Sequence, residues 1–227
     1  MVSFRKYLFL FDIDGTLISP GGVSRGLLAK AVTEKTGEKV HLGYNDVAGY
    51  TDRSIVRNAL LKMNQTITAA LLDRIFQYYF SLMKSEFMVS KDPFVYQDCV
   101  DFLDKVQNAG HAVCLLTGNM KAVARIKLEK FDLWKRFDFG VFAEDTEDKL
   151  AMPRLAKKRA WEVWKETFTE SHMVVVGDTV QDAEAGIKNG CKTVIVCRKR
   201  EKWDDINKMG PEWLGHCMDT MDLADLI

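Results

Sequence analysis

The sequence predicts an α/β protein: a doubly wound parallel sheet covered by helices on both faces, with a separate small all-helical domain inserted after the first strand. Three observations support this fold class. Short runs of consecutive apolar residues recur along the chain, and such runs suit strands that are buried on both faces. From about residue 95 onward these runs alternate with helical patterns, as in βαβ units. Between residues 20 and 90 only helical patterns occur.

The strands and helices of the sheet-forming part can be assigned in chain order. We predict strands at residues 7–11, 112–116, 139–142, 173–176 and 193–196, of which the run at 139–142 is the weakest. Apolar residues at helical spacing predict helices near residues 99–106, 156–168 and 180–187. Gly110 and the pair Asn189-Gly190 follow two of these helices as C-terminal stops.

The inserted block contains three helical patterns, near residues 27–32, 55–63 and 72–87. Pro20-Gly21-Gly22 precedes it. Lys91-Asp92-Pro93 marks its exit, because proline disfavours helix at the residue before it. We therefore expect a core of residues 1–18 and 92–227 and a helical domain of residues 19–91.

Composition excludes several classes of protein. The 32 basic and 32 acidic residues leave no net charge, so a chain-wide basic field for nucleic acid or an anionic membrane is absent. The five cysteines form no CxxC pair, which favours a reducing compartment over a zinc or disulfide framework. The apolar run near the start is too short for a signal peptide or a membrane span. We expect a cytoplasmic monomer or homodimer that binds neither nucleic acid nor membrane.

Polar residues follow three of the predicted strands at the point where each strand ends. These segments are Asp12-Ile13-Asp14-Gly15-Thr16, Thr117-Gly118-Asn119 and Gly177-Asp178-Thr179. In an open parallel sheet, ligands bind beyond the carboxyl ends of the strands. If the three strands are neighbours, two carboxylates of the first segment, the hydroxyl of the second and the carboxylate of the third meet at one site.

Such a cluster of carboxylates has a definite chemical preference. Neighbouring carboxylates repel one another and raise each other's pKa values unless a cation neutralises them. Mg²⁺ fits, because proteins usually hold it with one or two carboxylates, waters and a substrate phosphate. The site therefore suits phosphoryl transfer, in which positioning and charge neutralisation dominate, and an aspartate such as Asp12 can serve as a covalent nucleophile.

These segments also carry a family resemblance. The first strand with DIDGT, the segment LLTGN and the segment VVVGDTVQD resemble motifs one, two and four of the haloacid dehalogenase superfamily. The resemblance spans the chain, and the helical block lies where this family carries its cap domain. It implies a Rossmann-like core and, because motif one holds two aspartates, a Mg²⁺-dependent phosphatase.

The resemblance implies a role for each residue that matches a motif. Asp12 resembles the nucleophile, and Asp14 the general acid/base that protonates the leaving oxygen and then activates water. Thr117 resembles the hydroxyl that holds the phosphoryl oxygen. The neighbouring residues expected to bind substrate are Gly15, Gly118 and Asn119.

Motif four supplies the rest of the expected metal site. Asp178 resembles the metal ligand that acts beside Asp12 and the backbone carbonyl of Asp14. Asp182 resembles the second acidic residue of this motif, which supports the site more often than it binds the metal.

Motif three has no close counterpart in this chain. The family places a lysine or arginine after the third core strand, often followed by proline, but residues 144–154 read EDTEDKLAMPR. Lys149 lies closest to the expected loop position and is the preferred candidate. Arg154 is the second candidate, since Pro153 suits the first turn of a helix that would contain Arg154. The basic run at residues 157–159 has the pattern of a solvated helix face.

Residues 49–53 (GYTDR) resemble the substrate-specificity loop of helical caps. Thr51 also suits the N-cap of the helix that contains Ile55, and Asp52 suits its first turn. Arg53 suits bidentate recognition of a carboxylate or second phosphate, with a surface ion pair as the alternative.

The sequence thus predicts a Mg²⁺-dependent phosphatase that hydrolyses a small phosphomonoester, such as phosphoglycolate or a sugar phosphate, through an aspartyl-phosphate. A phosphomutase of the β-phosphoglucomutase type shares the same motifs and stays open. A metal-independent dehalogenase would not need Asp14. A phosphonate hydrolase would need a cap amine, and a phosphate-binding regulatory module would need neither Asp12 nor Asp14.

Overall fold

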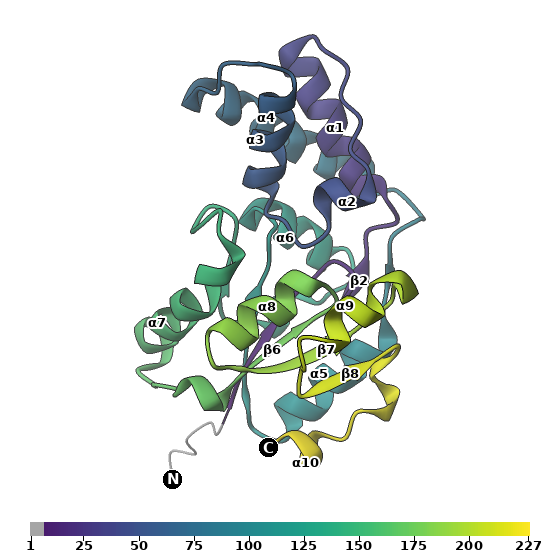
Figure 1. Cartoon of the computed structure of the whole chain (residues 1–227). Coiled ribbons are helices and arrows are strands. Elements are labelled where there is room, and N and C mark those ends of the chain that lie inside the picture. The colour runs from purple at the N-terminus through teal and green to yellow at the C-terminus, as the bar shows by residue number, and fades with distance from the viewer. Residues whose placement is uncertain (1–6) are drawn as a thin grey trace.

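The core of the protein is one parallel sheet of six strands in the order β5-β4-β1-β6-β7-β8. The computed structural model, drawn in Figure 1, describes residues 7–227. The strands are β1 (Leu8–Phe11), β4 (Ala112–Leu116), β5 (Gly140–Val141), β6 (Met173–Gly177), β7 (Lys192–Val196) and β8 (Trp213–Gly215). All five predicted strands are present. The edge strand β8 was not predicted, because its three residues are only partly buried and form no apolar run.

Strand β1 lies at the centre of this sheet and fixes the position of the site. Phe11, its last residue, pairs in register with Leu115 of β4 and Val176 of β6. The segments that follow β1, β4 and β6 therefore leave the sheet at the same edge. This edge is where the sequence places the polar segments that follow these strands, as expected for parallel strands.

Helices cover both faces of the sheet, as predicted. The core helices are α5 (Gln97–Asn108), α6 (Lys121–Glu129), α7 (Met152–Trp164), α8 (Val180–Lys188), α9 (Trp203–Asn207) and α10 (Leu223–Leu226). Side chains alternate across β1, so Phe9 and Phe11 pack in one cluster with Phe102 of α5, while Leu8 and Leu10 pack in another with Ala156 of α7. Short turns of helix connect these elements: η2 (Trp134–Arg136), η3 (Lys149–Ala151), η4 (Glu170–His172), η5 (Arg200–Lys202) and η6 (Met218–Thr220).

The short helices α2, α9 and α10 were not predicted, and two longer helices also differ from the sequence prediction. Helix α7 ends at Trp164, because Lys165 adopts a left-handed conformation (φ 61°), and Phe168 is buried in the loop that follows. Helix α6 was not predicted at all. Its apolar face includes Lys127, a buried lysine that interrupts the hydrophobic pattern.

The inserted helical block forms the upper part of the molecule in Figure 1. Its elements are α1 (Val23–Thr36), α2 (Tyr44–Val47), α3 (Asp52–Lys62), α4 (Ala69–Leu82) and the π-helical turn η1 (Met83–Phe87). They share a hydrophobic cluster that also takes in Val123 and Ile126 of α6, so the block packs on that helix.

A short antiparallel ribbon joins the helical block to the core. It pairs β2 (Ile18–Ser19) with β3 (Phe94–Val95), and two residues per strand are too few to produce a sequence pattern. We propose that the ribbon connects a helical cap of residues 19–91 to the core. Within residues 7–227, no helix combines the length and the apolar character that crossing a membrane requires.

Candidate active site

The DIDGT segment forms a tight turn directly after β1. The backbone N–H of Asp12 donates to the carbonyl of Val176 at 2.9 Å, so the strand pairing continues to this residue and holds it in place. Gly15 has a φ of +87°, and a Cβ there would lie 2.1 Å from Oδ2 of Asp178. Only glycine allows both this conformation and this close approach. The turn therefore packs against Asp178, the residue that follows β6.

Three carboxylates gather at this point. Among the described residues, ligand oxygens of Asp12, Asp178 and Asp182 lie within 4.8 Å of one another. Burial raises the pKa of Asp12 to about 7, and Lys149 opposes the rise while Asp182 adds to it. Burial and then the charge of Asp182 raise the pKa of Asp178 well above its usual value.

The cluster fits a hard cation. Oδ1 of Asp178 is buried and has no hydrogen-bond partner, which is costly for a carboxylate oxygen unless something binds it. The donors gathered here are all oxygens, the ligands that Mg²⁺ prefers. A cation would also offset the repulsion between carboxylates, which adds to the effect of burial on the two pKa values.

Lys149 of η3 lies within this cluster. Its Nζ is 2.8 Å from Oδ1 of Asp182 and 3.7 Å from Oδ1 of Asp12, and its side chain is buried. Burial alone would lower the pKa of Lys149, but the two carboxylates raise it above its ordinary value. Lys149 is therefore a cation held beside Asp12.

The other basic residues considered for motif three lie elsewhere. Arg154 is exposed on α7 and donates to Oδ1 of Asn189 at 3.1 Å. Lys157 forms an ion pair with Glu170 on the surface. Of the two candidates from the sequence, the structure places Lys149 in the site and Arg154 outside it.

Asp182 is oriented by the start of α8. Thr179 is the N-cap of this helix and forms a capping box with Asp182, and its Oγ1 also donates to Oδ2 of Asp182 at 2.5 Å. The same oxygen accepts the backbone N–H of Thr179 at 3.0 Å. Oδ1 is left to face Lys149. Asp182 thus contacts Lys149 directly, and its supporting role stays a prediction.

The second segment brings Thr117 and Asn119 to the same cavity. Both side chains are buried. Nδ2 of Asn119 donates to Oγ1 of Thr117 at 2.8 Å and to Oδ2 of Asp14 at 2.9 Å. Oγ1 of Thr117 also accepts the backbone N–H of Asn119 at 3.3 Å, and because it is an acceptor in both bonds, its own proton is free to bind an anion in the cavity.

Sequence reasoning missed Lys127 of α6. This residue is 1% exposed, and its Nζ donates to Oδ2 of Asp14 and to Oδ1 of Asn119, each at 2.5 Å. One signal was present in the sequence: a single lysine on the apolar face of a helix, between Ala124 and Leu128.

The loop at residues 49–53 docks directly on the second segment. Asp52 donates its N–H to the carbonyl of Gly118 at 2.7 Å, and its Oδ2 accepts the N–H of Met120 at 2.8 Å. A Cβ on Gly118 would lie 2.4 Å from the carbonyl oxygen of Tyr50, so glycine is required for this contact. Burial raises the pKa of Asp52 to about 6, against the opposing charge of Lys127.

The neighbours of Asp52 in this loop face away from the cavity. Thr51 caps α3 by accepting the N–H of Ser54 at 3.1 Å. Arg53 lies 3.7 Å from the carboxylate of Glu147, which also pairs with Arg57. The alternative of a surface ion pair therefore holds for Arg53. Its side chain is engaged by the loop that precedes Lys149 and does not line the cavity.

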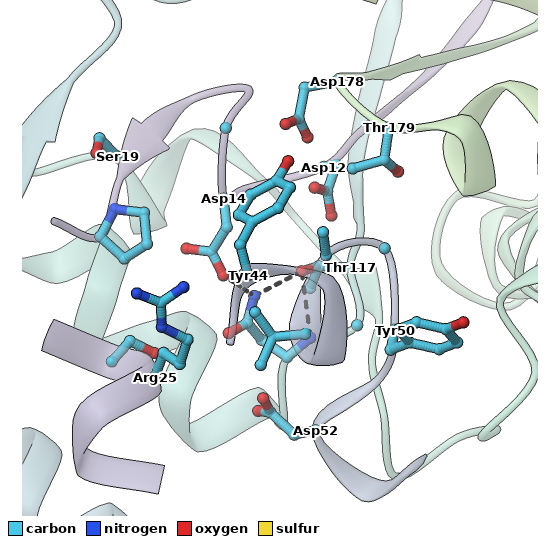
Figure 2. A pocket seen from close by; sticks show the side chains of 18 of the residues that line it. Asp12, Asp14, Ser19, Arg25, Tyr44, Tyr50, Asp52, Thr117, Asp178 and Thr179 are labelled. Atoms are coloured by element: carbon cyan, nitrogen blue, oxygen red, sulfur yellow. Dashed lines mark hydrogen bonds between the residues drawn. The ribbon is translucent and has the colours of Figure 1, made fainter. Parts of the chain in front are cut away.

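A cavity of about 490 Å³ lies between the core and the helical block (Figure 2). The core lines it with Asp12, Asp14, Thr117, Lys149 and Asp178, and the block with Arg25, Tyr44, Tyr50, Asp52 and Tyr79. Arg25 has no ion-pair partner among residues 7–227. Burial, followed by the charge of Asp178, raises the pKa of Tyr44 to about 12, so this cap hydroxyl stays protonated above the acidic cluster.

A doubly wound parallel sheet, two aspartates on the turn after its central strand and a helical block over that edge define a Rossmann-like α/β enzyme with a carboxylate-based site. The chain belongs to the haloacid dehalogenase-like hydrolases, whose family model matches residues 9–196. This confirms the resemblance inferred from the motifs.

Solved structures share this fold across nearly the whole chain. A predicted phosphoglycolate phosphatase from Haemophilus somnus matches with a TM-score of 0.69 and 14% identity, over 96% of this chain and 97% of its own. CbbY from Rhodobacter sphaeroides, solved with phosphate, matches with a TM-score of 0.75 and 14% identity, over 98% of this chain and 99% of its own. β-Phosphoglucomutase from Clostridium difficile matches with a TM-score of 0.73 and 14% identity, over 97% of this chain and 95% of its own. No curated protein sequence matches the chain.

Proposed function

We propose that the protein is a Mg²⁺-dependent phosphatase that hydrolyses a small phosphomonoester, of the phosphoglycolate or sugar-phosphate kind, through an aspartyl-phosphate on Asp12. The observation that carries this proposal is the arrangement around Asp12. Its carboxylate lies 3.7 Å from Nζ of Lys149, in one cavity with Asp14 and Thr117. The fold neighbours named as a phosphoglycolate phosphatase and a phosphoglucomutase add support.

Mg²⁺ would be held by the carboxylates of Asp12 and Asp178 and by the backbone carbonyl of Asp14. When bound, it would supply positive charge that lowers the repulsion between these carboxylates and the phosphoryl group.

Two reaction steps are proposed for the side chains. Asp12 attacks phosphorus, the bond from phosphorus to the ester oxygen breaks, and Asp14 gives a proton to that oxygen as it leaves. In the second step Asp14 takes a proton from water, which attacks the phosphoryl group on Asp12 and releases phosphate. Lys149 and the hydroxyl of Thr117 stabilise the negative charge on the phosphoryl oxygens throughout.

The cavity also favours a particular kind of substrate. Arg25 projects from α1 toward the site in Figure 2 and has the guanidinium geometry that binds a carboxylate or phosphate with two hydrogen bonds. We assign to Arg25 the contact with a second anionic group that the sequence suggested for Arg53. Substrates with a carboxylate or a second phosphate should therefore be preferred.

A panel of phosphomonoesters assayed with Mg²⁺ tests this function. We expect phosphate release that EDTA abolishes and added Mg²⁺ restores, and the highest kcat/KM for substrates with a second anionic group. Full activity in EDTA would contradict the metal requirement. Isomerisation of a sugar phosphate without release of phosphate would instead support the phosphomutase.

Arg25 and Arg53 provide a matched pair within the same panel. Arg25→Gln should lower kcat/KM for a doubly anionic substrate by about 10–100-fold, the range for losing a hydrogen-bonded charge pair. p-Nitrophenyl phosphate, which lacks the second anion, should lose much less. Arg53→Gln should leave both substrates close to wild type, and the reverse ranking of the two variants would return the role to Arg53.

Lys149 and Arg154 form a second matched pair. Removing one preorganised charge-stabilising group costs about 10²–10³ in kcat, and this loss is expected for Lys149→Ala. Arg154→Ala should cost less than about tenfold, because an exposed charge contributes little. Steady-state kinetics with one substrate would distinguish them. A larger loss for Arg154→Ala would overturn the assignment of Lys149.

A further inference from the structure

Lys127 carries a buried charge to which the reaction above gives no role. Its side chain is 2% exposed, and its Nζ contacts Asp14 and Asn119. An ammonium group is costly to bury unless it is paired and hydrogen-bonded. On a helix face that otherwise packs apolar residues, an apolar side chain would fill the same space without that cost. The reason for a lysine must therefore lie in the two groups that it contacts.

The first of these groups is one oxygen of Asp14. Oδ2 of Asp14 accepts from Nζ of Lys127 at 2.5 Å and from Nδ2 of Asn119 at 2.9 Å. Oδ1 is buried and has no partner. The carboxylate is thus held through Oδ2 by both donors, and Oδ1 accepts no hydrogen bond among the described residues.

The second group is the amide of Asn119. Because its Oδ1 accepts from Lys127, its Nδ2 must point the other way, toward Asp14 and Thr117. A flipped amide would place its oxygen against the carboxylate of Asp14. The orientation set by Lys127 therefore makes Oγ1 of Thr117 an acceptor from Asn119 and leaves the Thr117 hydroxyl proton for the substrate.

The helical block contributes to the charge balance around Lys127. Asp52 is buried beside α6, where its Oδ2 accepts the N–H of Met120, and the charge of Lys127 counters the rise in the pKa of Asp52. Lys127 therefore lies between an acidic residue of the core, Asp14, and one of the block.

We propose that Lys127 is a positioning residue for the reaction. It fixes the carboxylate of Asp14 through Oδ2 for proton transfer to the leaving oxygen, and it orients Asn119 and, through it, Thr117. This inference rests on the proposed phosphatase function, since it concerns the delivery of a proton to the leaving group.

The test compares two leaving groups in the variant Lys127→Met, which keeps an unbranched side chain, one atom shorter, and removes its charge and donors. For an alkyl phosphate, whose leaving oxygen needs a proton, kcat should fall about 10²-fold, with little change in KM. For p-nitrophenyl phosphate, whose leaving group is already stable, the loss should be at least tenfold smaller than this, because only the orientation of Asn119 and Thr117 then matters. Lys121→Met serves as the control, because Lys121 is exposed on the same helix, and it should match wild type for both substrates.

A double-mutant cycle separates positioning from a general loss of structure. If Lys127 acts on the proton transfer through Asp14, Lys127→Met in the Asp14→Asn background should cost the alkyl phosphate no more than it costs p-nitrophenyl phosphate in the wild-type background. The double variant loses one positive and one negative charge together, so neither charge is left without its partner. It can therefore be measured even if Lys127→Met alone does not fold. Equal losses for both leaving groups, or full additivity with Asp14→Asn, would overturn the proposal.

The denaturation midpoints of the same four proteins provide a readout that needs no activity. Contact between Asp14 and Lys127 predicts that their effects on the midpoint are not additive. Additive midpoints would overturn the pairing. A wild-type chain that releases no phosphate, yet shows coupled midpoints, would refute the phosphatase function while retaining Lys127 as the partner of Asp14.

Discussion

Asp12→Asn is expected to abolish turnover of every phosphomonoester while leaving the fold intact. Asparagine keeps the size of the side chain but removes the negative charge that attacks phosphorus and one carboxylate of the metal site. The measurement is phosphate release, in parallel with circular dichroism. A folded Asp12→Asn protein with near-wild-type kcat would exclude the covalent mechanism.

The acidic cluster also predicts how this variant affects stability. Burial raises the pKa of Asp12 to about 7, so above that pH its ionised form is less favourable in the folded chain than in the unfolded one. Without metal, the neutral asparagine should therefore not lower the denaturation midpoint above neutral pH. Asp73→Asn, at an exposed position of α4, is the matched control and should keep both activity and stability.

The central part of the fold was predictable because its signals are local. The run at residues 7–11 is apolar at every position, and β1 is fully buried at the middle of the sheet. β8 and the ribbon of β2 and β3 gave no such signal, since their strands are two or three residues long. Helix α6 was missed because Lys127 breaks the apolar pattern, and its burial depends on partners distant in the sequence.

The residues of the candidate site also fall into those that local sequence patterns could predict and those that depend on tertiary contacts. Asp12 and Thr117 follow apolar strands directly, so the parallel sheet alone brings them to one edge. The residues contributed by the helical block depend on how that block docks. Arg25 faces the cavity because α1 packs over it, whereas Arg53 turns to Glu147 on a core loop. No pattern within the block distinguishes these two arginines, because the difference arises from tertiary contacts.

Asp14→Asn should lower kcat by about 10²–10⁴-fold, the usual contribution of general acid–base catalysis. The backbone carbonyl of residue 14 is unchanged, so the dependence on Mg²⁺ concentration should stay close to wild type, in contrast to Asp12→Asn. The loss should be greatest for alkyl phosphates, whose leaving oxygen needs a proton. A marked shift in the Mg²⁺ requirement would instead indicate that the side chain of Asp14 takes part in binding the metal.

The contacts of Asp14 sharpen this expectation. Asparagine can still accept the hydrogen bond from Lys127 through its amide oxygen, so Asn119 and Thr117 should keep their orientation, and an aryl phosphate should retain much of its first-step rate. What is lost is the exchangeable proton of the carboxyl group, whose Oδ1 has no hydrogen-bond partner among the described residues. A plot of log kcat/KM against the pKa of the leaving alcohol should therefore be steeper for Asp14→Asn than for wild type. Parallel plots would mean that another group protonates the leaving oxygen, because loss of the acid must penalise basic leaving groups most.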